Sequence, residues 1–63
     1  MTNEVVTVAN GKVTIRETYD TAERAHKRFT ELVRVSRKKL CATDMITVYR
    51  LQDGYPMAIE EII

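Results

Sequence analysis

The side chains that could act as nucleophiles or bases are few and lie far apart. The chain of 63 residues holds one serine, Ser36, one histidine, His26, and one cysteine, Cys41. A nucleophile and its base must come within hydrogen-bond reach, but ten helical residues at 1.5 Å each separate His26 from Ser36 by about 15 Å. Cys41 lies still farther from His26. We therefore expect no Ser-His or Cys-His catalysis within one chain, and an enzyme has no support in the sequence.

Metal and nucleotide sites are not indicated either. A single cysteine and a single histidine cannot supply the ligand sets of structural zinc sites. The two glycines, Gly11 and Gly54, both occupy turn pairs, so no glycine-rich phosphate loop is left. Glu60 and Glu61 are neighbours on a predicted strand, where they point to opposite faces. The sequence predicts no catalytic residue, no metal and no cofactor.

Basic residues cluster between Asp20 and Lys39, with seven Lys and Arg against three acids, although the whole chain has a formal charge of only +1. Nucleic-acid binding would use such a patch for phosphates. A solvated face stabilised by i,i+4 pairs and by the helix dipole explains the same charges without a ligand. By helical spacing Val35 lies among these charges and could mark a contact surface. The predicted contacts to a partner or to phosphate are Arg24, Lys27, Arg28, Arg34, Val35 and Lys38.

The element that carries these charges is a predicted helix over residues 20–40. Asp20 and Glu23 have the spacing of a capping box, in which each carboxylate accepts from an unpaired amide of the first turn. At about 100° per residue, the apolar positions fall on one stripe that we expect to lie on a sheet. This stripe consists of Ala22, Ala25, Phe29, Leu32, Val33, Ser36 and Leu40.

A hairpin is predicted before the helix, over residues 4–17. Two β-rich runs flank Asn10-Gly11, a pair that tolerates the positive φ angles of a type I′ turn. Regular pairing from this turn places four β-branched side chains on one face, predicted to be buried. They are Val6, Val8, Val13 and Ile15. The other face, expected to meet water, carries Val5, Thr7, Ala9, Lys12, Thr14 and Arg16.

A second hairpin is predicted over residues 45–62, around the turn pair Asp53-Gly54. Pro56 favours an edge strand or the first residues of a strand, but it could also open a short helix over the residues that follow. Residues 49–60, with their Arg-Leu run, Asp-Gly turn, proline and Ala-x-Glu, resemble the hairpin of the UTRA effector-binding domain of GntR-type regulators. The resemblance covers about a dozen residues and implies a strand after Pro56.

This second hairpin is apolar on both faces. Regular pairing places Ile46, Val48, Met57 and Ile59 on one face, and Met45, Tyr49, Leu51, Ala58 and Ile62 on the other. A single helix covers only one side of a sheet, so the surplus face is a candidate for contact with a second chain. The residues predicted to mediate self-association are Met45, Tyr49, Leu51 and Ile62.

Together these elements predict one α+β domain over residues 1–63, with the order ββαββ and a small, mainly antiparallel sheet. We expect it in the cytoplasm, because the single cysteine and the polar first residues fit neither a disulfide framework nor a secretory signal. No apolar run approaches the roughly 18 residues of a membrane span.

Two functions remain open. The first is a non-enzymatic, homodimeric module that binds another protein, as an adaptor or inhibitor in the style of small phage and mobile-element proteins. The second is a small nucleic-acid-binding protein that uses the basic helix face.

Overall fold

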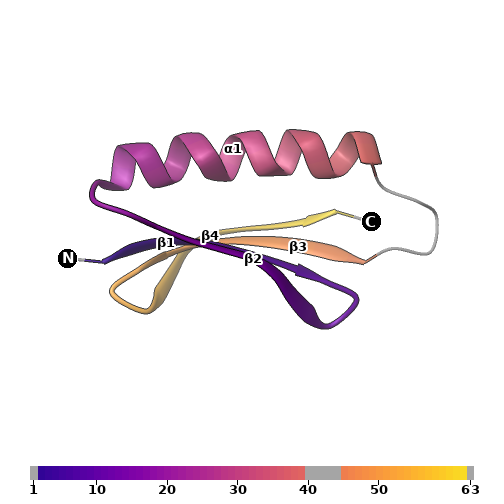
Figure 1. The fold of residues 1–63 in the computed structure, drawn as a ribbon, viewed down its shortest axis with the longest axis horizontal. Helices are drawn as coiled ribbons and strands as arrows, with labels where there is room; N and C mark the ends of the chain where they lie inside the picture. Colours follow the sequence, from indigo (N-terminus) through magenta and orange to yellow (C-terminus); the bar gives the residue numbers. More distant parts are fainter. Residues whose placement is uncertain (1, 40–44, 63) are drawn as a thin grey trace.

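The computed structural model describes residues 2–39 and 45–62 and shows an α+β fold with the order ββαββ (Figure 1). The elements are β1 (Asn3–Ala9), β2 (Lys12–Tyr19), α1 (Ala22–Lys39), β3 (Ile46–Gln52) and β4 (Tyr55–Ile62). The predicted fold class is confirmed, and the segment after Pro56 is a strand. Leu40 and Cys41 lie outside the described residues.

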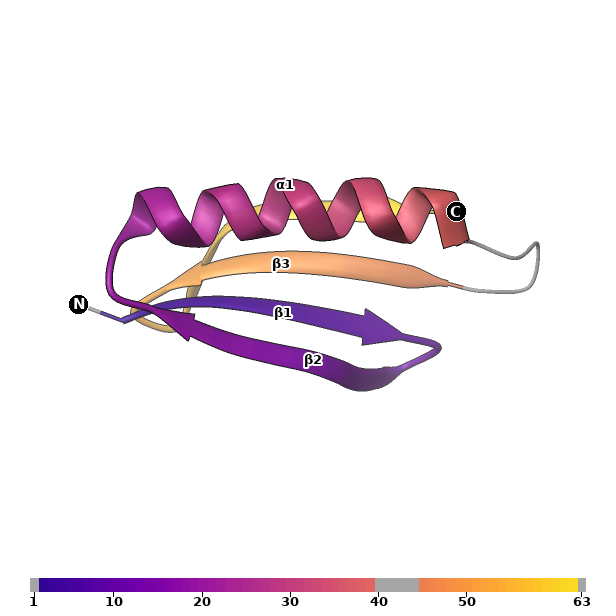
Figure 2. The ribbon, with the colours of Figure 1, turned by 45° about the horizontal axis from the view of Figure 1, so that its top comes forward.

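The four strands form one antiparallel sheet in the order β2-β1-β3-β4, so the two hairpins join along β1 and β3. Helix α1 lies across one face of this sheet (Figure 2). None of the described elements covers the opposite face, which we call the open face.

Both hairpin turns also hold the sheet together. Their central residues all have positive φ, at 52° and 81° for Asn10 and Gly11 and at 51° and 84° for Asp53 and Gly54, as type I′ turns require. The amide of Asn10 donates to the carbonyl of Met45 (2.8 Å), and its side-chain Oδ1 accepts from the Met45 amide (3.0 Å). Asp53 makes the same pair of bonds with the backbone of the residue before β1, each at 2.7 Å. Each turn thus fixes the register between β1 and β3.

Helix α1 begins two residues later than predicted. The Thr21 hydroxyl accepts a hydrogen bond from the amide of Arg24 at 3.2 Å, so Thr21 is the N-cap. The predicted capping box at Asp20 is therefore wrong by one residue. Asp20 instead forms an i,i+4 ion pair with Arg24 at 3.6 Å.

The core lies between the helix and the sheet. The predicted helix stripe is confirmed where Ala25, Phe29 and Leu32 are buried. They pack on Val5, Val48 and Ile62 from the strands, with Ile15, Tyr19, Val33, Ile46 and Ala58 partly buried around them.

The strand faces differ from the prediction because each hairpin contains a β-bulge. In β2, Val8 pairs with Val13 as predicted, but Thr7 then pairs with Ile15, which leaves Thr14 as the extra residue. An extra residue reverses the face of every side chain beyond it. The bulge brings Ile15 to the same face as Val5 and Thr7, and this face packs under the helix, where Val5 and Thr7 are buried. The prediction that they meet water is wrong.

The bulge in β4 has the same effect. Leu51 pairs with Pro56 and Arg50 with Ala58, so Met57 is the extra residue. Ile62 then pairs with Ile46 and lies in the core, only 4% exposed. The prediction that Ile62 shares a face with Tyr49 is wrong, because the regular register on which it rested ends at this bulge.

Candidate functional site

The open face of the sheet is built from three cross-strand rows. Its central row runs from Arg16 through Val6 and Tyr49 to Ile59. The row on one side contains Thr18, Glu4, Leu51 and Pro56, and the row on the other contains Val13, Val8, Thr47 and Glu61. Side chains alternate between the two faces of a strand, so all of these point away from the helix.

Apolar side chains cross this face as a diagonal band. It begins on β2, passes over the centre of β1 and β3, and ends at the start of β4. We define the apolar band as Val13, Val8, Val6, Tyr49, Leu51, Ile59 and Pro56, which the register places on the open face, together with the adjoining bulge residue Met57. The polar residues occupy the two remaining corners, with Glu4, Arg16 and Thr18 on one side and Thr47 and Glu61 on the other.

The band is accessible at both ends. Val13 is 61% exposed, Met57 56% and Ile59 52%, and the remaining members except Val6 are at least partly exposed. Single exposed apolar residues are ordinary, but a contiguous apolar patch framed by polar residues marks a contact surface. This band is the largest such patch that the register of the described strands assembles.

The bulge in β4 determines which residues of that strand belong to the band. Met57 is the extra residue of β4, and the residues after it change face, which places Ile59 outward and Ala58 beneath the helix. Pro56 has no amide hydrogen to donate, and proline is found in sheets at edge strands or bulges. Ile59 and Met57 were predicted to lie on the face opposite Tyr49 and Leu51, so neither was among the predicted self-association residues.

The predicted self-association residues therefore separate in space. Tyr49 and Leu51 lie on the open face and belong to the band. Met45 is exposed just before β3, whereas Ile62 is enclosed in the core. Half of the predicted set is thus brought together on one surface. If the alternation of strand faces had been shifted by one residue after Met57, it would have placed Ile59, and not Ile62, on the same face as Tyr49.

The helix is tied to β2 by a small ionic network. Arg28 donates from Nε to Glu17 at 2.8 Å and from Nη1 to Glu31 at 2.5 Å, and the Tyr19 hydroxyl donates to Glu17 at 2.9 Å. The hydrogen bond from Arg28 lowers the pKa of Glu17 despite the opposing effect of burial. Burial raises the pKa of Tyr19, and the hydrogen bond to Glu17 adds to this. These charged groups satisfy one another and hold the helix on the sheet.

The outer face of the helix is less basic than its sequence indicates. Arg28 is engaged by two acids, Arg24 pairs with Asp20, and Arg37 pairs with Glu60 of β4 at 2.5 Å. The basic side chains of the predicted patch without an ion pair to another described residue are Lys27, Arg34 and Lys38. Val35 is half-buried on the flank of the helix, which corrects the prediction that it lies among the exposed charges.

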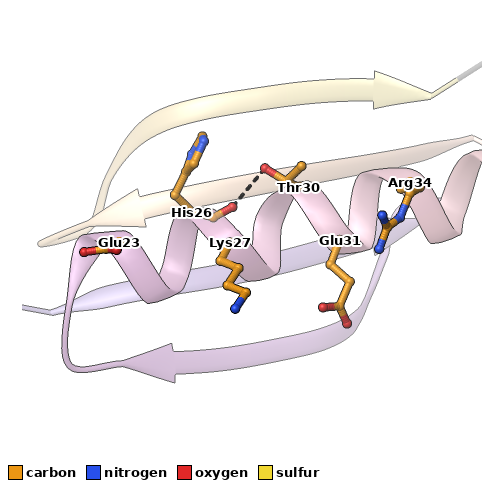
Figure 3. Close-up of a pocket in the computed structure, with 6 residues that line it drawn as sticks. All are labelled: Glu23, His26, Lys27, Thr30, Glu31 and Arg34. Atoms are coloured by element: carbon orange, nitrogen blue, oxygen red, sulfur yellow. Dashed lines mark hydrogen bonds between the residues drawn. The ribbon is translucent and has the colours of Figure 1, made fainter.

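A shallow hollow of about 480 Å³ lies along this outer face (Figure 3). Its lining residues are Glu23, His26, Lys27, Thr30, Glu31 and Arg34. Figure 3 shows that these side chains do not converge, since His26 points to one side of the helix and Lys27 and Glu31 to the other. The His26 ring instead stacks near Phe29, with centroids 6.2 Å apart. The hollow therefore offers no assembled group of acid, base and nucleophile.

Comparisons with known proteins found no match: neither a protein-family model, nor a curated sequence, nor a solved structure resembles this chain. The local resemblance of residues 49–60 to the UTRA hairpin is thus not extended by any family match. Within residues 2–39 and 45–62, no three His, Cys, Asp or Glu side chains gather where they could hold a metal ion. In the same part of the chain, helix α1 does not have the combination of length and apolar composition that crossing a membrane requires.

Proposed function

We propose that this chain is a non-enzymatic module that binds another protein, as an adaptor or inhibitor, through the apolar band on its open face. The observation that carries this proposal is the band itself, because Val13 and Ile59 are each more than half exposed on the open face, and the bulge residue Met57 beside Pro56 is equally exposed. Leaving such a surface in water is unfavourable by roughly 25 cal/mol for each Å² that a partner could cover. The free energy for binding is therefore available at this face.

Binding suits this face better than catalysis does. Its titratable side chains are few, and Arg16 already pairs with Glu4 at 3.0 Å. The helix leaves this face open to solvent, whereas small substrates are usually held in concave pockets. As part of the same proposal, the protein acts in the cytoplasm, as a small accessory protein of the kind that phages and mobile elements encode.

Affinity capture with three forms of the protein tests the proposal. Ile59→Asp places a charge within the band, at a side chain that is 52% exposed and makes no core contact. Tyr55→Asp is the matched control, because Tyr55 is 73% exposed on the same strand but lies outside the band. Partner proteins from the native host should bind the wild type and Tyr55→Asp and be lost with Ile59→Asp. Partners retained equally by all three forms would contradict the proposal.

Nucleic-acid binding by the outer helix face is the second candidate. The observation that favours it is that Lys27, Arg34 and Lys38 have no acidic partner among the described residues. Three phosphate contacts would give a slope of about −2.7 in a plot of log affinity against log salt, at about 0.9 per contact. Binding to a generic duplex should then fall on Lys27→Glu and Arg34→Glu. Absence of binding even at low salt would eliminate this candidate.

A further inference from the structure

We infer that the apolar band is covered by the same band of a second copy of this chain, in a two-fold dimer whose sheets pack face to face. The two helices would then lie on the outside, and the dimer would have four layers in the order helix, sheet, sheet, helix. This inference rests on the proposed function, in which the open face is the binding surface: the second copy covers the band in the free protein, and a partner protein displaces it.

The open face has almost no net charge, and this favours a partner surface that is also nearly neutral. The face carries three charged residues, of which Glu4 and Arg16 already neutralise each other. Glu61, at the corner, is the third. A surface with so little net charge gives no electrostatic preference to nucleic acid or to a strongly charged protein. A second open face is apolar in its centre and polar at its corners, and it therefore matches the first.

The size of the face also fits a small dimer. Four strands about 4.8 Å apart and seven residues of about 3.3 Å each give a face of about 19 by 23 Å. Two such faces have a flat area of about 870 Å² together, and interdigitated side chains raise the buried area toward the roughly 1,200 Å² at which specific interfaces begin. We therefore expect a specific but weak dimer, with a dissociation constant in the micromolar range.

The direction of the band sets the packing angle. The band rises by about four residues along the strands while it crosses three strand spacings, so it runs at about 45° to the strands. A two-fold axis that lies between the sheets superposes the two bands when it is parallel or perpendicular to them. In either case the strands of the two sheets cross at about 90°, which is one of the two angles that packed sheets adopt. Packing at about 30° would leave both ends of each band uncovered.

Six of the eight band residues are also arranged symmetrically about the centre of the band. Val6 and Tyr49 pair across β1 and β3 at the middle of the sheet. On either side of them, Val8 corresponds to Leu51 and Val13 to Pro56, because the two hairpins have the same register and bulge position. This correspondence covers Val13, Val8, Val6, Tyr49, Leu51 and Pro56, whereas the equivalents of Ile59 and Met57 are Arg16 and Thr14. The centre of the band therefore meets a rotated copy of itself with apolar side chains opposite one another.

Sedimentation over a concentration series from about 1 µM to 1 mM is the first test, with Cys41→Ser in every form so that no disulfide can form between chains. The wild type should pass from monomer to dimer within this range. Ile59→Asp should weaken the dimer at least 100-fold, because each copy would bury a carboxylate at the interface. Tyr55→Asp should leave the dissociation constant within about two-fold. Circular dichroism melts establish that both variants remain folded.

Spin-label distances in the dimer test its geometry. Labels at Thr47→Cys, on the open face, should lie within about 25 Å of each other, since packed sheets are about 10 Å apart. Labels at Arg34→Cys, on the outer side of α1, should be more than about 40 Å apart, because two sheets and two helices separate them. An edge-to-edge dimer would lengthen the first distance and overturn the inference.

The outcomes separate the two proposals. A monomer at every concentration that still captures a different protein, and loses it with Ile59→Asp, overturns the dimer and supports the proposed function. A monomer that captures nothing overturns both. A dimer that Ile59→Asp leaves intact has its interface elsewhere, and this also overturns the inference.

Discussion

An offset of 43 residues relates the two hairpins of this protein. It takes the turn residue Asn10 to Asp53 and the bulge residue Thr14 to Met57. The same offset relates the two hydrogen bonds between Asn10 and Met45 to the two between Asp53 and Thr2. The sheet therefore has an approximate two-fold axis between β1 and β3, and the hairpins are two versions of one structure.

Only three of the 17 equivalent positions hold the same residue. Val5 and Val48 are both 0% exposed in the core. Gly11 and Gly54 both have φ above 80°, where a side chain is disfavoured. Glu17 and Glu60 both accept a hydrogen bond from an arginine of α1. The shared residues are thus those that form the core, the turn and the attachment of the helix.

Where the two hairpins differ, they have different roles in the molecule. In the first hairpin, Glu17 belongs to a network with Tyr19, Arg28 and Glu31. In the second, Glu60 makes a single exposed pair with the helix. The second hairpin supplies five of the eight band residues, counting the bulge residue Met57. The first hairpin secures the helix, and the second provides most of the proposed binding surface.

The largest effect is expected from removing the shared core residue. Val5→Ala and Val48→Ala should each lower the free energy of unfolding by about 2 kcal/mol, from the lost methyl groups and the cavity left behind. Because both side chains are fully buried at equivalent positions, the two losses should agree to within about 0.5 kcal/mol. Urea denaturation of both variants measures this. A large difference would show that the two-fold relation does not extend to the packing of the core.

A second prediction concerns a position where the hairpins differ in the core. Asn3 is only 1% exposed, and neither atom of its amide has a hydrogen-bond partner. The equivalent residue is Ile46, which packs against the core. Asn3→Ile should therefore raise the free energy of unfolding by about 1–2 kcal/mol, because it removes an unsatisfied buried amide and restores apolar contacts.

Asn3→Ala is the control for this change, since it removes the amide without filling its volume, and it should gain less than Asn3→Ile. Thermal and urea unfolding measure both variants. A loss of stability in Asn3→Ile would mean that the Asn3 amide has a partner, such as a buried water, that offsets its desolvation.

The sequence predicted the elements of this fold correctly because their determinants are local. Asn10-Gly11 and Asp53-Gly54 specify turns by backbone conformation alone, and the apolar stripe of α1 follows from helical spacing. The pairing next to the first turn, with Val8 opposite Val13, was also correct. Each of these features depends on residues only a few positions apart, so it can be recognised from a short stretch of sequence.

The faces of the strands could not be predicted in the same way. A bulge is one extra residue, and neither Thr14 nor Met57 differs from an ordinary strand residue in type. Its effect accumulates, because every residue beyond it changes face. The error at Ile62 and the omission of Ile59 from the surface both come from Met57. With only three identical positions, the repeat that would have revealed two equivalent bulges is not visible in the sequence.

A smaller effect is expected where the two hairpins hold the helix. Glu17→Gln should cost up to about 1 kcal/mol, and Glu60→Gln only a few tenths, as is usual for exposed ion pairs. The difference follows from exposure and partners: Arg28 is 30% exposed and bonded to two acids, whereas Arg37 is 59% exposed and bonded to one. Urea denaturation at pH 7 gives both values. Equal losses of stability in the two variants would show that the first hairpin does not hold the helix more strongly than the second.

The smallest expected effect is the pH dependence of the stability change caused by Glu17→Gln. Its hydrogen bond from Arg28 lowers the pKa of Glu17 from the ordinary value of 4.5. A carboxylate with a lowered pKa in the folded state stabilises the fold fully above its unfolded pKa, and this stabilisation is lost as the pH falls through the folded value. The difference in unfolding free energy between wild type and Glu17→Gln should therefore be constant from pH 7 to about 5 and shrink in more acidic solution. Tyr19→Phe, which removes one hydrogen bond to Glu17 but keeps its pair with Arg28, should keep most of this acid dependence. A difference between wild type and Glu17→Gln that stays constant down to pH 3 would show that the charge of Glu17 does not hold the helix to the first hairpin.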